Sequence, residues 1–284
     1  MTPITGMRNV LLALGTTLAA ASAGAACVDV QGDPAQGGMI WGEVPTRATV
    51  TLDGEAIDVL PDGHFVAGFG RDAGSRSLLV VETEGERCEQ ALDVVVREYR
   101  IQRVEGVPQR TVTPPPEDLE RIRRERALVV AAKGRRVEEP GWLKQVVGVF
   151  RWPALGPISG VYGSQRVYNG KPGNPHYGVD VAAPAGTPVR APADGLVTLA
   201  EPDLFYSGGT IILDHGYGLS SSFLHLSEVG VSVGEEIRQG AVIGAIGASG
   251  RATGPHLDWR MSFRGRRIDP QRLVPPMPRA PGEP

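Results

Sequence analysis

The chain has 284 residues, which is long enough for one or two domains with a buried core. Its formal net charge of -3 provides no overall basic field, which argues against nucleic acid as a partner. The 38 glycines and 24 prolines, together with few aromatic residues, favour short strands and frequent turns over long helices.

The N-terminus has the pattern of an export signal. Arg8 precedes the apolar run Val10–Leu14, and small residues follow as far as Ala26. The run is too short to cross a bilayer, and a signal peptidase needs the small, uncharged residues at its end. We therefore expect residues 1–26 to be a signal peptide cleaved near Ala25 or Ala26. The expected location is periplasmic or secreted, with no transmembrane segment after cleavage.

The sequence contains two cysteines, Cys27 and Cys88. In an oxidising compartment we expect them to pair, and closing this loop would stabilise the fold by roughly 4 kcal/mol. A lipid anchor on Cys27 is the alternative, because this cysteine directly follows the expected cleavage site. The disulfide is favoured, since Gly24 stands where a lipoprotein signal usually has an apolar residue.

Residues 27–98 alternate apolar and polar residues as strands do. Thr49–Leu52 leads into the turn at Asp53 and Gly54, and further short apolar runs follow between turn residues. This spacing is typical of a small β-sandwich, here tied by the cysteine pair. His64 is its one histidine, and a lone histidine is more often structural than catalytic. We expect an accessory domain, through which other envelope proteins could bind.

Residues 99–150 are expected to connect two domains, with a helix over about 116–133. Prolines at 114–116 can open this helix, acidic residues precede basic ones as the helix dipole favours, and Gly134 can end it. A linker that packs on a neighbouring domain is the favoured interpretation. A basic surface for an anionic wall polymer or a membrane is the alternative, although a mixed charge run is usually a solvated face.

In residues 151–274, short apolar runs are separated by frequent glycine and proline residues. This pattern indicates an antiparallel β domain with almost no helix. A proline-rich tail follows over residues 275–284. The overall expectation is a mainly β chain: a small N-terminal β-sandwich and a C-terminal antiparallel β domain, joined by a short helical connector.

The C-terminal domain carries histidine and aspartate residues with the spacing of a metal site. His176 and Asp180 lie four positions apart, and can reach one ion if the segment bends. His256 and Asp258 lie two apart, so that both side chains point to the same face of a strand. His225 lies between these two segments in the sequence. This pattern predicts one metal site, built from distant segments on a β scaffold.

Read in order, these segments resemble a LytM-type, M23-class zinc metallopeptidase domain, the lysostaphin-like group that cuts peptidoglycan peptides. The resemblance covers residues 151–272 and depends on the following segments: Ile158–Gly163, His176-x-x-x-Asp180, Pro188–Gly195, Asp214-His215-Gly216, His225-Leu226-Ser227, Val233–Gly240, Ile246–Gly250 and Thr253–His256. It implies one Zn²⁺ per chain and a peptidoglycan peptide as substrate. The family usually has His-x-His in its last motif, where this chain has Asp258 in place of the second histidine.

The resemblance implies that His176, Asp180 and Asp258 bind the metal, and that His225 and His256 are unliganded catalytic histidines. We assign the general-base role to His256 and the steadying of an oxyanion or water to His225, although the two roles could be exchanged. Two carboxylate ligands cancel the charge of Zn²⁺. A more alkaline pH optimum and greater tolerance of manganese are therefore expected than with a His-Asp-His ligand set.

Other residues of the domain have less specific patterns. Asp258 could instead orient Arg260 or a neighbouring histidine. His215 is expected in a turn, and Tyr162 and Tyr177 in packing. Tyr168, beside an apparently exposed loop, is a weaker candidate for a transition-state donor.

The favoured function is a secreted zinc metalloendopeptidase acting on peptidoglycan peptides, with the D-Ala to diaminopimelate cross-link as the expected bond in a periplasm. A non-catalytic LytM-type envelope protein that regulates another cell-wall hydrolase is the alternative. It is less favoured because such proteins usually lose several site residues, and here the one altered ligand remains a metal-binding type. A lipoyl- or biotinyl-type carrier is excluded because no lysine follows Lys171.

Overall fold

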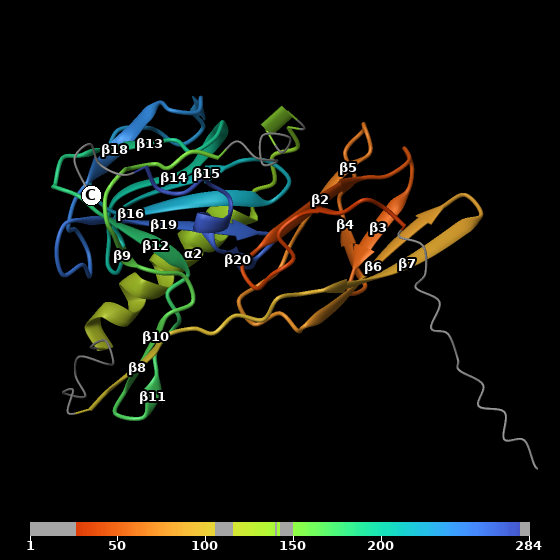
Figure 1. The fold of residues 1–284 in the computed structure, drawn as a ribbon. Coiled ribbons are helices and arrows are strands. Elements are labelled where there is room, and N and C mark those ends of the chain that lie inside the picture. The colour runs from red at the N-terminus through yellow and green to blue at the C-terminus, as the bar shows by residue number, and fades with distance from the viewer. Residues whose placement is uncertain (1–26, 106–115, 140, 143–149, 279–284) are drawn as a thin grey trace, which may run out of the picture.

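The computed structural model describes residues 27–105, 116–139, 141–142 and 150–278. The expected signal peptide, part of the connector and the end of the tail lie outside these ranges. The described residues form mostly strands, arranged in the two β regions expected from the sequence (Figure 1), so the mainly β fold class is confirmed. Among these residues no helix has the length and apolar character that crossing a membrane would need.

The N-terminal region pairs two antiparallel sheets around one core. The first has the order β1 (Gln31–Gly32), β2 (Met39–Glu43), β5 (His64–Gly68), and the second β4 (Glu55–Ile57), β3 (Thr49–Leu52), β6 (Arg76–Thr83), β7 (Glu86–Asp93). Asp53 and Gly54 make the tight β3–β4 turn with φ angles of 53° and 79°, which match a type I′ hairpin. Between the sheets, Ile40, Phe65 and Leu79 are completely buried. This arrangement is a β-sandwich.

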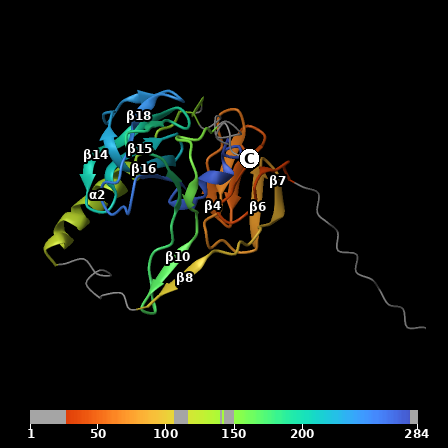
Figure 2. The same cartoon turned by 60° about the vertical axis from the view of Figure 1, so that its left-hand side comes forward.

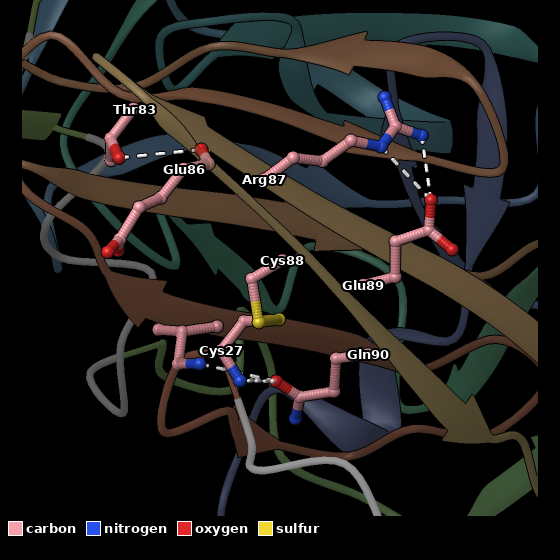
Figure 3. Close-up of a disulfide and its surroundings, with 8 residues drawn as sticks. Cys27, Thr83, Glu86, Arg87, Cys88, Glu89 and Gln90 are labelled. Carbon is pink, nitrogen blue, oxygen red and sulfur yellow. Dashed lines mark hydrogen bonds and ion pairs between the residues drawn. A yellow bond between two sulfur atoms is a disulfide. The ribbon is translucent and has the colours of Figure 1, made fainter.

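Cys27 and Cys88 form the expected disulfide, which ties the start of the described chain to strand β7 (Figure 3). Beside it, the Gln90 side-chain oxygen accepts hydrogen bonds from the backbone N–H groups of Cys27 and Val28, at 2.9 and 3.2 Å. No free cysteine remains among the described residues. The N-terminal segment is therefore held against the sandwich by a covalent bond and by two hydrogen bonds.

The connector contains one strand and one helix in its described part. Strand β8 (Ile101–Val104) pairs in parallel with β10 (Gln165–Tyr168), which also pairs with β11 (Lys171–Pro172). A short 3₁₀ turn, Pro116–Asp118, leads into helix α2 (Leu119–Gly134). Helix α2 lies against strands β14 and β15 of the C-terminal region (Figures 1 and 2). Both described elements of the connector, strand β8 and helix α2, therefore pack onto the C-terminal region.

Apart from β10 and β11, the strands of residues 150–278 form one large antiparallel sheet. Its strands are β9 (Ile158–Gly160), β12 (Gly178–Ala182), β13 (Pro188–Arg190), β14 (Gly195–Leu204), β15 (Gly208–Asp214), β16 (Leu219–Val229), β17 (Glu236–Ile237), β18 (Val242–Ile246), β19 (His256–Phe263) and β20 (Arg266–Ile268), followed by a 3₁₀ turn, Pro270–Arg272. The main path runs β17-β14-β15-β16-β19-β12-β9. One face of this sheet packs against an apolar core, in which Phe223, Leu257 and Trp259 are fully buried.

The two β regions lie side by side in both views and share a contact surface (Figures 1 and 2). Met39 and Val66 of the sandwich belong to the same apolar cluster as Phe263 and Ile268 of the large sheet. The Arg97 guanidinium binds the buried Asp269 carboxylate at 2.8 Å across this surface. The sandwich therefore packs against the far end of β19 and against β20, away from the His256 end.

Candidate metal centre

Two neighbouring strands bring together aspartates that are far apart in the sequence. In the antiparallel pair β12–β19, Asp180 lies directly opposite Asp258. Cross-strand partners share a face of the sheet, so both carboxylates point the same way. The flanking Leu257 and Trp259 point into the core, since side chains alternate along a strand. Asp258 is therefore on the opposite face from the core, yet it is only 2% exposed.

His176 completes the cluster from the segment just before β12. Its Nε2 lies 3.1 Å from Asp180 Oδ1 and 3.5 Å from Asp258 Oδ1. Its Nδ1 lies 3.3 Å from the Val161 carbonyl oxygen, and its backbone N–H donates to the Ser164 carbonyl at 2.7 Å. These contacts hold the ring with Nε2 aimed at the two carboxylates.

The three residues fit a metal ion. One ligand atom from each lies within 4.8 Å of the others. His176 Nε2 and Asp180 Oδ1 are buried without a well-formed hydrogen bond, although they face each other. Glycines leave the space that the carboxylates occupy: a Cβ at Gly178 would lie 2.6 Å from Asp258 Oδ1, and one at Gly160 would collide with Asp180. Imidazole nitrogen and carboxylate oxygen are both good zinc ligands.

The charges in the cluster reinforce one another in the absence of a metal. Burial acts to lower the pKa of His176, but the nearby carboxylates of Asp180 and Asp258 outweigh it and raise this pKa to about 10. Burial acts to raise the pKa of Asp258, but Arg260 and His176 outweigh it and hold this pKa far below its usual range. A cation at this position would replace the proton on His176.

Arg260 binds Asp258 from the same face of β19, two residues along the strand. Its Nε donates to both carboxylate oxygens at 3.0 Å, and its Nη2 donates to Oδ2 at 2.5 Å. From the sequence, Arg260 is expected only as an alternative partner of Asp258. The structure shows this contact together with the approach of Asp258 to His176.

His225 and His256 lie beside the cluster, with ring centroids 4.9 Å apart. His256 Nε2 is 3.9 Å from Asp180 Oδ1. The Nδ1 atoms of His225 and His256 lie 2.9 and 2.8 Å from the carbonyl oxygens of Ser249 and Gly254. A carbonyl oxygen only accepts hydrogen bonds, so Nδ1 carries the hydrogen and Nε2 is the basic nitrogen in both rings. Burial lowers the pKa of His225, which keeps that ring neutral near pH 7.

The backbone at His225 is unusual for a strand, with φ at 65°. The pairing of β15 with β16 shifts register between the Gly209 and Ile211 positions. The His225 N–H leaves the regular ladder and donates to the Ser207 carbonyl at 2.8 Å. Such a local irregularity re-aims a side chain, which here brings His225 next to His256.

Two further residues of the domain, His215 and Tyr162, have structural roles. His215 is fully buried and its ring nitrogens lie 2.7 Å from the Asp194 carbonyl oxygen and 2.8 Å from Ser221 Oγ. Burial lowers its pKa to about 4, so it stays neutral. Tyr162 is buried and its hydroxyl donates to the Arg267 carbonyl at 2.7 Å. Tyr168 lies on β10, and its role stays a prediction.

One residue near the cluster was not anticipated. Lys133 comes from helix α2, and the electrostatic environment of its ammonium includes Arg260, Arg267 and Asp258. Sequence patterns place Lys133 only on a helix of the connector, so its approach to the cluster depends on how that helix packs.

Comparison with known proteins agrees with this fold and geometry. Residues 174–270 match Peptidase family M23. The structure of a peptidase M23 from Pseudomonas aeruginosa resembles this one with a TM-score of 0.62 and 31% sequence identity, over 84% of this chain and 94% of that chain. This likeness extends beyond the large sheet to most of the described molecule. The chain belongs to peptidase family M23.

Curated relatives match about a third of the chain. The DD-carboxypeptidase/endopeptidase Mpg of Neisseria meningitidis is 40% identical over 103 residues, which make up 36% of this chain and 24% of that protein. The peptidoglycan DD-endopeptidase ShyA of Vibrio cholerae is 38% identical over 103 residues, again 36% of this chain and 24% of that protein. The chain therefore spans about a quarter of the length of these relatives.

Proposed function

We propose that this protein is a zinc metalloendopeptidase that hydrolyses peptide bonds of peptidoglycan. The observation that supports this most directly is the convergence of His176, Asp180 and Asp258, with His225 and His256 beside them. The relatives named as peptidoglycan DD-endopeptidases make the D-Ala to diaminopimelate cross-link the proposed bond. A periplasmic or secreted location is consistent with the disulfide, since disulfides persist in oxidising compartments.

Each residue has a distinct part in this proposal. His176 Nε2, Asp180 Oδ1 and Asp258 Oδ1 would hold the ion, and bound Zn²⁺ would polarise the scissile carbonyl and activate water. His256, with its basic Nε2 near Asp180, takes a proton from the attacking water and returns it to the leaving amine. His225, with its Nδ1–H held by the Ser249 carbonyl, accepts a hydrogen bond from the attacking water through Nε2 and steadies that water from the neighbouring position.

Zinc content and cleavage, measured on the same preparations, test this assignment. Wild type should bind one zinc per chain and cleave cross-linked muropeptides, with products identified by chromatography and mass spectrometry. His256→Ala should retain zinc and lose cleavage, whereas Asp258→Asn should lose both. His64→Gln, at a partly exposed histidine of the sandwich, is the matched control and should behave as wild type.

Two outcomes would contradict the proposal. A protein that binds zinc but leaves every muropeptide intact would favour the regulatory alternative. Full zinc binding by Asp258→Asn would remove Asp258 from the ligand set.

A further inference from the structure

A small three-stranded sheet projects from the molecule beside the candidate metal centre. Its strand order is β11-β10-β8, and in both views it extends away from the two β regions (Figures 1 and 2). Asn169 and Gly170, with φ angles of 48° and 75°, make the tight turn between β10 and β11. This sheet, made of residues 101–104 and 165–172, is referred to as the β arm.

The β arm is joined to the candidate metal centre through the backbone of His176. The His176 N–H donates to the Ser164 carbonyl at 2.7 Å, and the His176 carbonyl accepts the Gly163 N–H at 2.7 Å. Gln165, the first residue of β10, follows Ser164 directly, and its N–H donates to the Arg100 carbonyl at 3.0 Å. The arm therefore has a fixed position relative to the His176 ring.

The strand register divides the arm into two faces. Arg166 lies opposite Gln102 of β8, and Tyr168 lies opposite Lys171 of β11. Cross-strand partners share a face, and so do residues two apart on one strand. Arg166, Tyr168 and Lys171 therefore share one face. Arg100, two residues before Gln102, extends the same face toward the root of the arm.

This face gathers positive charge without acidic partners. Arg100, Arg166 and Lys171 are all exposed, and none of them forms an ion pair with another residue that the structure describes. The three strands and the β10–β11 turn contain no acidic residue, since Glu98 and Glu105 lie outside them. The chain as a whole has a net charge of -3, so these three cations around the half-buried Tyr168 are a local exception. They are referred to as the basic face.

The proposed substrate carries negative charge near its scissile bond. Diaminopimelate has two amines and two carboxyl groups, and a D-Ala cross-link acylates one of the amines. The carboxyl group at that end stays free, and it is ionised at neutral pH because carboxyl groups titrate well below pH 7. The diaminopimelate that precedes the D-Ala keeps a free carboxylate at the end of its side chain in the same way. A glycine bridge has no such group.

The distance from the metal centre to the basic face suits a peptide of this kind. A strand rises about 3.3 Å per residue, so Arg166 lies roughly 7 Å along β10 from Ser164, the residue that binds the His176 backbone. An extended peptide covers a similar length per residue. A carboxylate one residue and one side chain away from the scissile carbonyl can therefore reach the arm.

We propose that the basic face of the β arm binds free carboxylates of the peptidoglycan peptide, and so selects anionic diaminopimelate cross-links over uncharged bridges. The proposal rests on the proposed function and names the part of the substrate that the chain recognises away from the metal. Arg166 and Lys171 supply the charge, and Tyr168 packs against the apolar part of the diaminopimelate side chain. An anionic lipid surface would also attract exposed cations, but it would not require the fixed distance to His176 that the arm provides.

Each charge contributes modestly because these cations are exposed. Pairs between exposed charges are weak in water and weaken further with salt. Removing one cation should weaken peptide binding roughly 3-fold, and removing two should weaken it roughly 10-fold. The loss should fall on KM rather than on kcat, because the basic face does not take part in the reaction itself.

Binding of a cross-linked diaminopimelate muropeptide tests the proposal. The measurement uses the full chain, loaded with zinc and carrying His256→Ala so that the peptide is not consumed. In this parent protein, Arg166→Gln/Lys171→Gln should weaken binding roughly 10-fold at low salt, and each single substitution roughly 3-fold. Arg103→Gln is the matched control and should bind as the parent does, because Arg103 is exposed on the other face of the arm, opposite Val167.

The same peptide with amidated diaminopimelate carboxyl groups identifies the group that is bound. The parent protein should bind the amidated peptide about as weakly as the double variant binds the anionic one, and the double variant should not distinguish the two peptides. With His256 restored, Arg166→Gln/Lys171→Gln should raise KM for the anionic peptide by the same factor and leave kcat unchanged.

Unchanged binding by the double variant, or an equal loss for the anionic and the amidated peptide, would overturn the proposal. Binding to vesicles of anionic phospholipid that the double variant loses, while its muropeptide binding stays at the parent level, would overturn it in favour of a membrane contact. Charge-dependent muropeptide binding without cleavage by wild type would retain the carboxylate site and reject the peptidase function. Cleavage with binding that is independent of the carboxylates would do the reverse.

Discussion

The Arg260 guanidinium binds the Asp258 carboxylate asymmetrically: Nη2 and Nε both contact Oδ2, whereas Oδ1 receives only Nε. Oδ1 is also the oxygen that faces His176 Nε2, at 3.5 Å. Asp258 can therefore offer one oxygen to a metal while the other is held by Arg260, as ligating carboxylates usually are. Arg260 also places a positive charge beside Asp258, which offsets the negative charge of this carboxylate.

The buried pair between Arg260 and Asp258 predicts a large stability effect. Arg260→Met should destabilise the metal-free protein by about 3–5 kcal/mol, because it leaves a buried carboxylate without its main partner. Denaturant unfolding of metal-free protein measures the change. Arg76→Met removes one partner of an exposed pair with Asp93 and should change stability by less than about 1 kcal/mol. Equal effects of the two substitutions would contradict a stabilising role for the buried pair.

Replacing the altered ligand predicts a change in the pH profile. Asp258→His exchanges a carboxylate for a neutral imidazole and so adds a positive charge at the centre. The acid limb of the cleavage profile should move to lower pH than in wild type, and manganese should support less of the activity. Identical profiles for the two proteins would refute this prediction.

The sequence was informative where local patterns decide structure. The turn at Asp53 and Gly54 and the helix end near Gly134 depend on the residues themselves, and the structure has both features. The same-face position of His256 and Asp258 follows from strand periodicity alone. The pairing of Cys27 with Cys88 required only the compartment and the cysteine count.

Long-range packing set the limit of what could be predicted. The register that places Asp180 opposite Asp258 depends on how β12 and β19 align, which no local pattern specifies. The left-handed backbone at His225 arises from an irregular pairing with β15 and has no glycine to signal it. The position of α2 over the face of the metal centre depends on a weakly amphipathic helix whose docking is decided by a few side chains.

The raised pKa of His176 predicts how the stability of the metal-free protein depends on pH. Its folded pKa is about 10, above the usual 6.5, so the stabilisation is fully present below pH 6.5 and is lost as pH rises toward 10. The melting temperature in the presence of a chelator should fall across this range. His176→Gln should flatten the dependence, whereas His64→Gln should leave it as in wild type. A profile in wild type as flat as that of His176→Gln would contradict the raised pKa.

The disulfide predicts a redox dependence of stability. The paired cysteines are 61 positions apart, and on the chain-entropy model closing such a loop contributes about 4 kcal/mol. Reducing agent should lower the unfolding midpoint of the N-terminal region of wild type. The Cys27→Ser/Cys88→Ser variant should match reduced wild type and should not respond to the reducing agent. A midpoint in wild type that is independent of reducing agent would contradict a stabilising disulfide.

The backbone at His225 predicts a reversal of the usual ranking of alanine and glycine. His225 has a φ of 65°, where a side chain with a Cβ costs roughly 1–2 kcal/mol and glycine costs little. His225→Gly should therefore be more stable than His225→Ala by about 1 kcal/mol in denaturant unfolding, even though both variants lose the same imidazole.

His256 lies at the start of β19 and is not among the described residues with positive φ. There His256→Gly should be less stable than His256→Ala by about 0.5–1 kcal/mol, because glycine weakens a strand. If alanine were the more stable replacement at both positions, the backbone of His225 would not be held in the left-handed region, and its approach to His256 would need another cause.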